Sequence, residues 1–282
     1  MQAQPTNAAP QKSGLSGVKH VIAVASGKGG VGKSTTTANL ALAMAAEGAR
    51  VGVLDADIYG PSQGMMLGIP QGTRPETPTE NAMKPIMAQG LQVMSISLLI
   101  DETTPMVWRG PMASGALQQL AMQTLWDDLD YLVIDMPPGT GDIQLTLSQK
   151  VSVDGAVIVT TPQDIALLDA KRGIEMFRKV DIPVLGVVEN MSTHICSNCG
   201  HEEHIFGAGG GERIAHDYDT QLLGSVPLSL SVRERVDQGK PTVSHDPESD
   251  IAQRYRSIAK QVMAAVESAD NSGSPMIEVV DD

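Results

Sequence analysis

Short runs of β-branched and aliphatic residues alternate with longer helical patterns along most of this 282-residue chain. Because each run is apolar on both faces, it has the character of a strand in a parallel sheet that helices cover on both sides. The alternation therefore predicts an α/β fold, a doubly wound and mainly parallel sheet with helices on both faces. The expected strands span residues 21–24, 51–54, 131–134, 156–159, 184–188 and 222–226; the expected helices span residues 34–47, 113–126, 163–180 and 248–268; and residues 73–90, with three prolines, are expected to form a loop or sheet edge.

A glycine-rich segment lies between the first expected strand and the first expected helix. Its sequence, GKGGVGKS from Gly27 to Ser34, fits the spacing G-x-x-x-x-G-K-[ST] of a phosphate-binding loop. Glycines let backbone N–H groups turn toward a phosphate, and the helix that follows directs its positive dipole end at the same charge. We expect a P-loop NTPase fold in which Lys33 contacts the β- and γ-phosphates of ATP and Ser34 binds Mg²⁺. The predicted nucleotide-binding residues of this segment are Gly27, Lys28, Gly29, Gly30, Val31, Gly32, Lys33, Ser34 and Thr35.

Aspartates follow two other expected strands: Asp55 and Asp57 come after residues 51–54, and Asp135 comes after residues 131–134. Ligands of open parallel sheets bind at the carboxyl ends of the strands, so we expect these carboxylates at the phosphate site. We assign Asp135 and Asp55 to the magnesium shell and Asp57 to positioning the attacking water. The alternative for each aspartate is a turn residue or a helix N-cap.

Lys28 is an additional lysine, because the phosphate loop itself requires only Lys33. A cation that a neighbouring subunit supplies to a phosphoryl-transfer site can be worth about 10³–10⁵ in rate. The loop resembles the deviant phosphate loop of the dimeric MinD/ParA-like ATPases, which include division-site and plasmid-partition ATPases and the nitrogenase iron protein. The resemblance implies a homodimer in which Lys28 crosses the interface to the partner's phosphates. Lys28, Lys33 and Asp57 are therefore the expected catalytic residues.

The chain has two cysteines, Cys196 and Cys199, which are too few for a disulfide scaffold. Thiolates are soft ligands for zinc and for iron–sulfur clusters. One chain supplies two thiolates, whereas a four-iron cluster needs four, and two chains related by a two-fold axis supply four. We therefore expect Cys196 and Cys199 to hold a 4Fe–4S cluster that bridges a homodimer. The additional lysine of the phosphate loop points to a dimer independently.

Zinc is the main alternative at the cysteine pair. CSNCGH resembles half of a zinc ribbon, and His194, His201 and His204 are near enough in sequence to complete a mononuclear site. With zinc in place of iron, the chain would be a zinc-stapled ATPase of the partitioning class. A redox dithiol is disfavoured, because the motif does not open a helix in a thioredoxin-like unit.

Composition excludes several other classes of function. The chain carries 20 Lys and Arg against 33 Asp and Glu, a net charge of −13, and aromatic residues make up 3%. Neither value suits a protein that binds nucleic acid through a basic surface or through stacked bases. No apolar run approaches the roughly 18–20 residues of a membrane span, and no secretory signal is visible. We expect a cytoplasmic protein with no nucleic-acid or membrane partner.

An ordered set of motifs extends the resemblance from residue 18 to about residue 265. It consists of the phosphate loop and of residues 55–62, 108–112, 129–142 and 189–211, the last with CSNCGH followed by IFG and GGG. On these motifs the chain resembles the Mrp/ApbC family of iron–sulfur cluster carrier ATPases. The resemblance implies a homodimer that binds ATP, hydrolyses it slowly, holds a bridging 4Fe–4S cluster and transfers it to recipient apo iron–sulfur proteins. It also implies an adenine contact for Asn190. Residues 108–112 precede an expected helix, and we expect them at the dimer interface, with capping and packing of that helix as the alternative.

The chain is expected to form one domain between two tails. Residues 1–17 are rich in Pro, Gln, Ser, Ala and Gly and predict a disordered N-terminal tail. Residues 18–269 are expected to form a single P-loop ATPase domain with a Cys-x-x-Cys insertion near residues 194–204, and residues 270–282 an acidic disordered tail. Many bacterial members of the family carry an extra small N-terminal domain. Only about 20 residues precede the first strand here, which predicts a short form without that domain.

Overall fold

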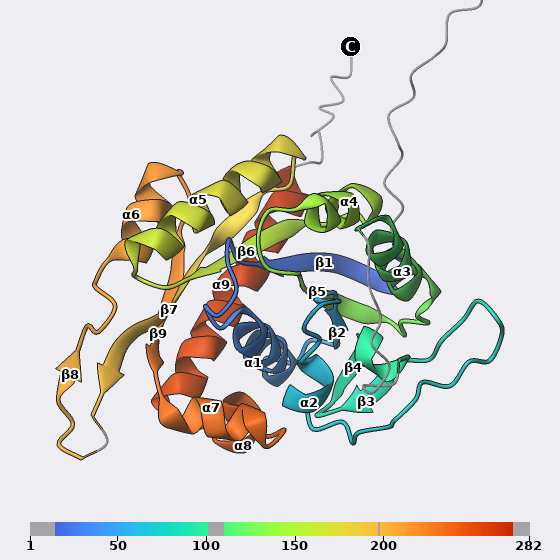
Figure 1. Ribbon diagram of the computed structural model, residues 1–282, viewed down its shortest axis with the longest axis horizontal. Helices are drawn as coiled ribbons and strands as arrows, with labels where there is room; N and C mark the ends of the chain where they lie inside the picture. The colour runs from blue at the N-terminus through green and yellow to red at the C-terminus, as the bar shows by residue number, and fades with distance from the viewer. Residues whose placement is uncertain (1–14, 101–109, 197, 273–282) are drawn as a thin grey trace, which may run out of the picture.

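Figure 1 shows the protein as a computed structural model, which describes residues 15–100, 110–196 and 198–272. The strands are β1 (Val18–Ala25), β2 (Val51–Asp55), β3 (Ile86–Ala88), β4 (Leu91–Ser95), β5 (Leu129–Asp135), β6 (Gly155–Thr160), β7 (Val184–Ile195), β8 (Glu202–Glu203) and β9 (Leu222–Leu228). Within the described residues they form one nine-stranded sheet in the order β3-β4-β2-β5-β1-β6-β7-β8, with β9 paired to β7. The β3–β4 and β7–β8 pairs are antiparallel and the other pairs are parallel.

Helices cover both faces of the sheet (Figure 1). One face carries α3 (Gly110–Gln123), α4 (Asp142–Lys150), α5 (Asp164–Lys179) and α6 (Gly210–Asp217). The other carries α1 (Lys33–Ala46), α2 (Gln63–Met66), α7 (Leu230–Asp237), α8 (Thr242–His245) and α9 (Asp250–Ser272), and α1 packs against α9. A 3₁₀ turn, η1 (Ile96–Leu98), follows β4.

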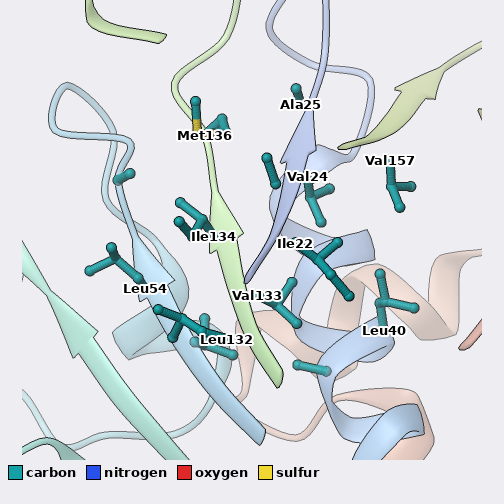
Figure 2. Packing of buried hydrophobic residues seen from close by; sticks show 14 of the residues in the cluster. Ile22, Val24, Ala25, Leu40, Leu54, Leu132, Val133, Ile134, Met136 and Val157 are labelled. Carbon is teal, nitrogen blue, oxygen red and sulfur yellow. The ribbon is translucent and has the colours of Figure 1, made fainter. Parts of the chain in front are cut away.

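The hydrophobic core lies between the sheet and these helices. Ile22 of β1, Leu132 of β5 and Leu40 of α1 are completely buried, and the neighbouring strands contribute similar residues. Figure 2 shows side chains of β1, β2 and β5 together with Leu40 in this cluster. Because helices cover both faces, the central strands bury nearly every side chain, which explains their continuous apolar sequence.

The strand order reverses direction beside β1, and this reversal positions the functional site. From β1 the chain continues to β2 and β4 on one side of the sheet, whereas from β5 it continues to β6, β7 and β9 on the other. Ligands of such sheets bind in the crevice outside the carboxyl ends of the strands at this point. The glycine-rich loop that follows β1 and Asp135, which ends β5, both lie there.

The predicted fold class is confirmed, and each of the six expected strands is present. Residues 73–90 include β3, which forms the edge of the sheet as expected. The expected helix at residues 113–126 is α3, which begins at Gly110 and ends at Gln123. It ends early because the chain then pairs Thr124 with Met83 and buries Trp126. The remaining elements were not predicted from the sequence: β4, β8 and the short helices α2, α4, α6, α7 and α8.

The expected domain boundaries need a small correction at both ends. Residues 15–17 belong to the fold and not to a disordered tail, because Leu15 is buried and the backbone of Gly17 accepts a hydrogen bond from Leu129 N (2.7 Å). Residues 270–272 continue α9. The rest of both expected tails, residues 1–14 and 273–282, lies outside the described residues. In the described part of the chain, no helix combines the length and the apolar character that crossing a membrane requires.

Candidate functional site

The glycine-rich loop joins β1 to α1 in a conformation that favours glycine. Gly30 and Gly32 have φ angles of 81° and 83°, a left-handed backbone that side chains rarely adopt. A Cβ on Gly32 would also lie 2.1 Å from Nδ2 of Asn190. Gly32 is the N-cap of α1 and supplies no capping side chain, and the first turn of the helix holds no acidic residue. Backbone N–H groups and a positive helix end are therefore left for an anion.

Lys33, the first residue of α1, is bound to the acid that ends β5. Its Nζ lies 2.5 Å from Oδ1 of Asp135 and 3.6 Å from Oδ2 of Asp57. It also donates to Oγ of Ser34 (3.3 Å). The side chains of Lys33 and Asp135 are 7% and 0% exposed. The structure thus brings together four residues that were predicted to form one phosphate site: Lys33, Ser34, Asp57 and Asp135.

Asp55 lies directly beside Asp135 in the β2–β5 register, and both carboxyl groups are completely buried. Burial, followed by the neighbouring charge of Asp135, raises the pKa of Asp55 to about 7, although backbone hydrogen bonds from Gln63 and Ser62 and the charge of Lys33 act in the opposite direction. Burial also raises the pKa of Asp57, against the opposing effect of Lys33. Four groups donate to Asp55: Ser62 N (2.8 Å), Gln63 N (3.0 Å) and Ser95 Oγ (3.1 Å) to Oδ2, and Asp57 N (3.2 Å) to Oδ1.

Gln63, which the sequence analysis did not single out, is also part of this cluster. Its Nε2 donates to Oδ2 of Asp135 (2.8 Å) and to the backbone oxygen of Ser34 (2.9 Å). Nothing in the local sequence marks it, because α2 has only four residues and no apolar periodicity to read.

The donor set at this crevice suits Mg²⁺. Hydroxyl and carboxylate oxygens of Ser34, Asp57 and Asp135 lie around one ammonium group, and hard oxygen ligands are those that Mg²⁺ prefers. Among the described residues, His, Cys, Asp and Glu side chains nowhere gather in a group of three that could hold a metal ion. Magnesium in such sites typically retains waters and binds phosphate oxygens of the nucleotide as well.

Lys28 differs from Lys33 in having no charged partner within the described part of the chain. Its side chain is half-buried and forms no ion pair with any described residue. The neighbouring Gly27 packs tightly on α5, since a Cβ there would lie 2.1 Å from the backbone of Asp169. The front of the loop is thus held against α5, and the Lys28 ammonium is left for another group. Thr35 lies in the first turn of α1, where its backbone oxygen accepts from Asn39 Nδ2 (2.9 Å).

Asn190 reaches the phosphate loop from β7. Its Nδ2 donates to the backbone oxygen of Val31 (2.9 Å), and its side chain is buried. Its neighbour Met191 has a φ of 56°, an uncommon value for a residue with a side chain. The structure therefore places Asn190 against the loop; the expected adenine contact stays a prediction.

The two cysteines lie in the turn of a hairpin that extends β7 beyond its parallel neighbours. The last pairs of β7 with β8 are His194 with Glu203 and Ile195 with Glu202. Cys196 N then donates to His201 O, and Gly200 N donates to Cys196 O, both at 2.9 Å. Figure 1 shows this hairpin projecting from the margin of the molecule.

The turn exposes its thiols and favours a thiolate. Cys196 is half-buried, Cys199 is exposed, and both are free of disulfides. Hydrogen bonds from the backbone N–H groups of Asn198 and Cys199, and from the Cys199 thiol, lower the pKa of Cys196. A lower pKa increases the fraction of the thiolate, which is the form that binds metal.

Two of the three histidines of the zinc alternative, His194 and His204, have contacts with other residues of the hairpin. Nδ1 of His204 lies 3.1 Å from the backbone oxygen of Ser192, and Nδ1 of His194 lies 3.6 Å from Oε1 of Glu203. His201 is exposed.

In the motif at residues 108–112, Trp108 and Arg109 lie outside the described residues, and the motif continues into the start of α3.

Known families and proteins resemble the chain over most of its length. A sequence model of the family described as "ParA: NUBPL iron-transfer P-loop NTPase" matches residues 17–263. The iron-sulfur cluster carrier protein of Pseudomonas fragi is 67% identical over 255 residues, which cover 90% of this chain and 89% of that protein. The protein of the same name from Escherichia coli (strain K12) is 63% identical, with 89% and 68% covered. The iron-sulfur cluster transfer protein NUBPL of Mus musculus is 52% identical, with 92% and 82% covered.

Two solved structures share the fold. The nucleotide-binding protein of Archaeoglobus fulgidus, in complex with ADP, superposes with a TM-score of 0.71 at 36% identity and covers 83% of this chain and 90% of that one. The cell division ATPase MinD of Pyrococcus furiosus superposes with a TM-score of 0.65 at 25% identity and covers 87% and 98%. Both comparisons support the overall fold described above.

Proposed function

The chain belongs to the ParA family of NUBPL iron-transfer P-loop NTPases, and from this premise we propose that it is an ATP-hydrolysing carrier of iron–sulfur clusters. Two copies hold one 4Fe–4S cluster between Cys196 and Cys199 of each chain and transfer it to recipient apo iron–sulfur proteins. The observation that carries the proposal is the hairpin that presents both thiols at the margin of a nucleotide-binding domain.

The phosphate loop supports the ATP-binding part of the proposal. The A. fulgidus neighbour was solved with ADP, and the same fold in this chain provides the loop amides, Lys33 and Ser34 for the phosphates. Lys33 exchanges its bond with Asp135 for the β- and γ-phosphates when ATP binds. Ser34 and Asp135 are the residues that would hold Mg²⁺, which would supply neutralisation of charge on the phosphate oxygens.

Asp57 is suited to the attacking water. Burial raises its pKa, so it accepts a proton more readily than an ordinary carboxylate does. It lies 3.6 Å from the Lys33 ammonium, next to the phosphate position. Asp57 thus orients the water and holds its proton, while Lys28 of a second chain stabilises the charge that develops on the transferred phosphoryl group.

The cysteine turn supports the cluster-binding part. Four thiolates are required by a four-iron cluster, and one chain supplies two at the tip of a single hairpin. A two-fold axis through the cluster brings the second pair, and the free Lys28 is consistent with a second chain nearby. Exposure of Cys199 leaves the cluster accessible to the thiols of a recipient protein.

Strand β7 offers a direct link between the two sites. It carries Asn190, which contacts the phosphate loop, and it leads into Cys196 six residues later, about 20 Å along an extended strand. Its pairing with β9 is interrupted between Asn190 and His194, so this stretch is less constrained by its neighbour. A movement of the loop on ATP binding or hydrolysis is therefore transmitted along β7 to the cysteine turn, which couples the ATP cycle to release of the cluster.

Anaerobic reconstitution tests the cluster directly. Purified protein is incubated with iron and sulfide, and iron, sulfide and zinc are counted per chain for the wild type, Cys196→Ala and Cys199→Ala. We expect about two irons per chain in a wild-type dimer, which is one four-iron cluster for two chains. Each cysteine variant should lose both the iron and the colour of the cluster. Asn198→Ala, a change in the same turn that keeps both thiols, is the matched control and should load normally. Zinc near one-half or one per chain with no iron uptake would contradict the proposal and favour a zinc-stapled ATPase.

Coupling to ATP requires a second experiment. Loaded wild type and loaded Lys33→Ala are mixed with an apo iron–sulfur protein, and transfer is followed with and without ATP and Mg²⁺. We expect ATP to change the transfer rate of the wild type and to leave that of Lys33→Ala unchanged. Equal responses of both proteins to ATP would show that the cluster moves independently of the nucleotide.

A further inference from the structure

Gln63 joins three elements at the centre of the nucleotide site. It is completely buried. Its backbone N–H donates to Asp55 at the end of β2, and its Nε2 donates to Asp135 at the end of β5 (2.8 Å) and to the backbone oxygen of Ser34 in α1 (2.9 Å). A side chain with these contacts responds to any change at the carboxylate or at the start of the helix.

The other end of the Gln63 amide has no hydrogen-bond partner in the part of the chain that the structure describes. Its Oε1 is buried, and no described residue donates to it. Buried amide oxygens are nearly always hydrogen-bonded, and one without a partner beside a ligand site is open to a donor that arrives with the ligand. A water molecule on Mg²⁺ is such a donor, because metal-bound water donates strong hydrogen bonds.

Three side chains donate hydrogen bonds to Asp135, and one of them, Lys33, is also expected to bind the phosphates of the nucleotide. Lys33 and Thr37 both contact Oδ1, whereas Gln63 contacts Oδ2. When Lys33 moves to the phosphates, its bond to Asp135 is lost. Thr37 has one hydroxyl proton and a competing acceptor, the backbone oxygen of Lys33, at 3.0 Å. Gln63 then provides the strongest remaining hydrogen bond to the carboxylate.

We propose that Gln63 is a positioning residue for the magnesium site: it keeps the Asp135 carboxylate oriented after Lys33 has moved to the nucleotide, and its Oε1 accepts a hydrogen bond from a metal-bound water. The inference rests on the proposed nucleotide and Mg²⁺ binding of this site. Partners that orient a metal ligand in this way typically contribute about 10- to 100-fold to metal affinity. The Gln63 side chain is not needed to anchor α2, because the backbone N–H groups of Ser62 and Gln63 already bind Asp55.

The test separates magnesium-dependent from magnesium-independent nucleotide binding. A fluorescent, non-hydrolysable ATP analogue is titrated into the full chain in EDTA, and Mg²⁺ is then titrated into the complex. For Gln63→Met, which has similar length and no hydrogen-bonding amide, we expect affinity in EDTA within about twofold of the wild type and a Mg²⁺ requirement about 10- to 100-fold higher. Gln63→Asn keeps an amide that is one methylene too short to bridge, and it should behave in the same way. Gln261→Leu removes a glutamine that donates to Leu223 O from α9, far from the site, and is the matched control.

Each outcome has one meaning. A wild-type Mg²⁺ requirement in both Gln63 variants overturns the inference, and so does an equal loss of affinity in EDTA and in Mg²⁺, which would make Gln63 structural only. If thermal unfolding shows that Gln63→Met is not folded, the Gln63→Asn titration decides alone. If the wild type itself binds the analogue no more tightly with Mg²⁺ than in EDTA, the proposed function fails at the nucleotide site, and Gln63 has no magnesium site to serve.

Discussion

The ammonium nitrogen of Lys33 lies 2.5 Å from Oδ1 of Asp135 at the centre of the sheet's carboxyl edge. Both side chains are buried, and the second buried acid, Asp55, lies next to Asp135 on the neighbouring strand. Lys33 therefore compensates buried negative charge before any nucleotide is bound. Removing one partner of a buried pair leaves an uncompensated charge, which costs more than the pair contributes. The lysine that is expected to bind phosphate thus also stabilises the fold.

Lys33→Met should for this reason destabilise the nucleotide-free protein. We expect the free energy of unfolding to fall by about 3–5 kcal/mol, because Asp135 remains buried beside Asp55 without a cation. The double variant Lys33→Met, Asp135→Asn should recover part of that loss, since it no longer buries the Asp135 charge. Denaturant unfolding in EDTA, analysed as a double-mutant cycle, measures the coupling. A Lys33→Met protein with the wild-type unfolding midpoint and slope would show that the pair contributes nothing to stability.

Stability of the nucleotide-free protein should decrease as the pH rises from about 4 to about 7. Burial raises the pKa of Asp55 from its ordinary value of 3.8 to about 7. Over this interval the folded chain keeps a proton that the unfolded chain has released, so each added pH unit favours unfolding, by about 1.4 kcal/mol at the steepest. The raised pKa of Asp57 adds to the slope with the same sign.

Asp55→Asn is the variant that tests this slope. It should unfold more easily at every pH, because its amide replaces one carboxylate oxygen that accepts hydrogen bonds, but its stability should depend less on pH between 4 and 7. Asp130→Asn is the control, since ion pairing with Arg50 and Lys19 lowers the pKa of Asp130 and its contribution is lost only at lower pH. An unchanged slope in Asp55→Asn would refute the assignment.

Much of the fold was predictable because its signals are local. The six central strands are apolar on both faces, and the phosphate loop has fixed spacing between a strand and a helix. The family was predictable for the same reason, since its motifs are short contiguous segments, and the family match confirms it. The strand β7 was predicted only to residue 188, because its continuation contains Glu189, Asn190 and other polar residues. Glu189 and Asn190 are buried by contacts with distant segments, such as the bond from Gly211 N to Oε1 of Glu189 (2.8 Å).

The parts of the site that escaped prediction depend on tertiary contacts. Gln63 and Asp135 are 72 residues apart and meet only because β2 and β5 are neighbours. The loop contact of Asn190 joins residues 159 positions apart. No periodicity or spacing within the sequence encodes such pairs. By contrast Cys196 and Cys199 were visible from their spacing alone, and the structure added the hairpin and the lowered pKa of Cys196.

Asn190→Ala should weaken communication between the two sites without preventing cluster loading. The variant loses the bond from Nδ2 to Val31 O, and one such bond is worth about tenfold in nucleotide affinity at most. We expect normal iron content after reconstitution, weaker binding of the ATP analogue, and a smaller effect of ATP on the rate of cluster transfer. Ser192→Ala, on the same strand, removes a bond to Val226 O and leaves the loop untouched, so it serves as the control. If Asn190→Ala keeps the full ATP response, β7 is not the link.

Lys28 should act on the nucleotide of the partner chain, and two inactive variants can show this. Lys28→Ala loses the cation that no described residue engages, and Asp57→Asn loses the group that positions water; each homodimer should hydrolyse ATP poorly. The two chains are co-expressed with different affinity tags, and the heterodimer is isolated by two successive purifications. If Lys28 acts across the interface, one of the two sites of the heterodimer has both an intact Asp57 and an intact Lys28 from the partner. Activity should then return to about half of that of the wild-type dimer. If Lys28 instead acts on the nucleotide of its own chain, each site of the heterodimer lacks one of the two groups, and activity stays at the level of the single variants. The steady-state ATPase rate of this heterodimer therefore distinguishes the two arrangements.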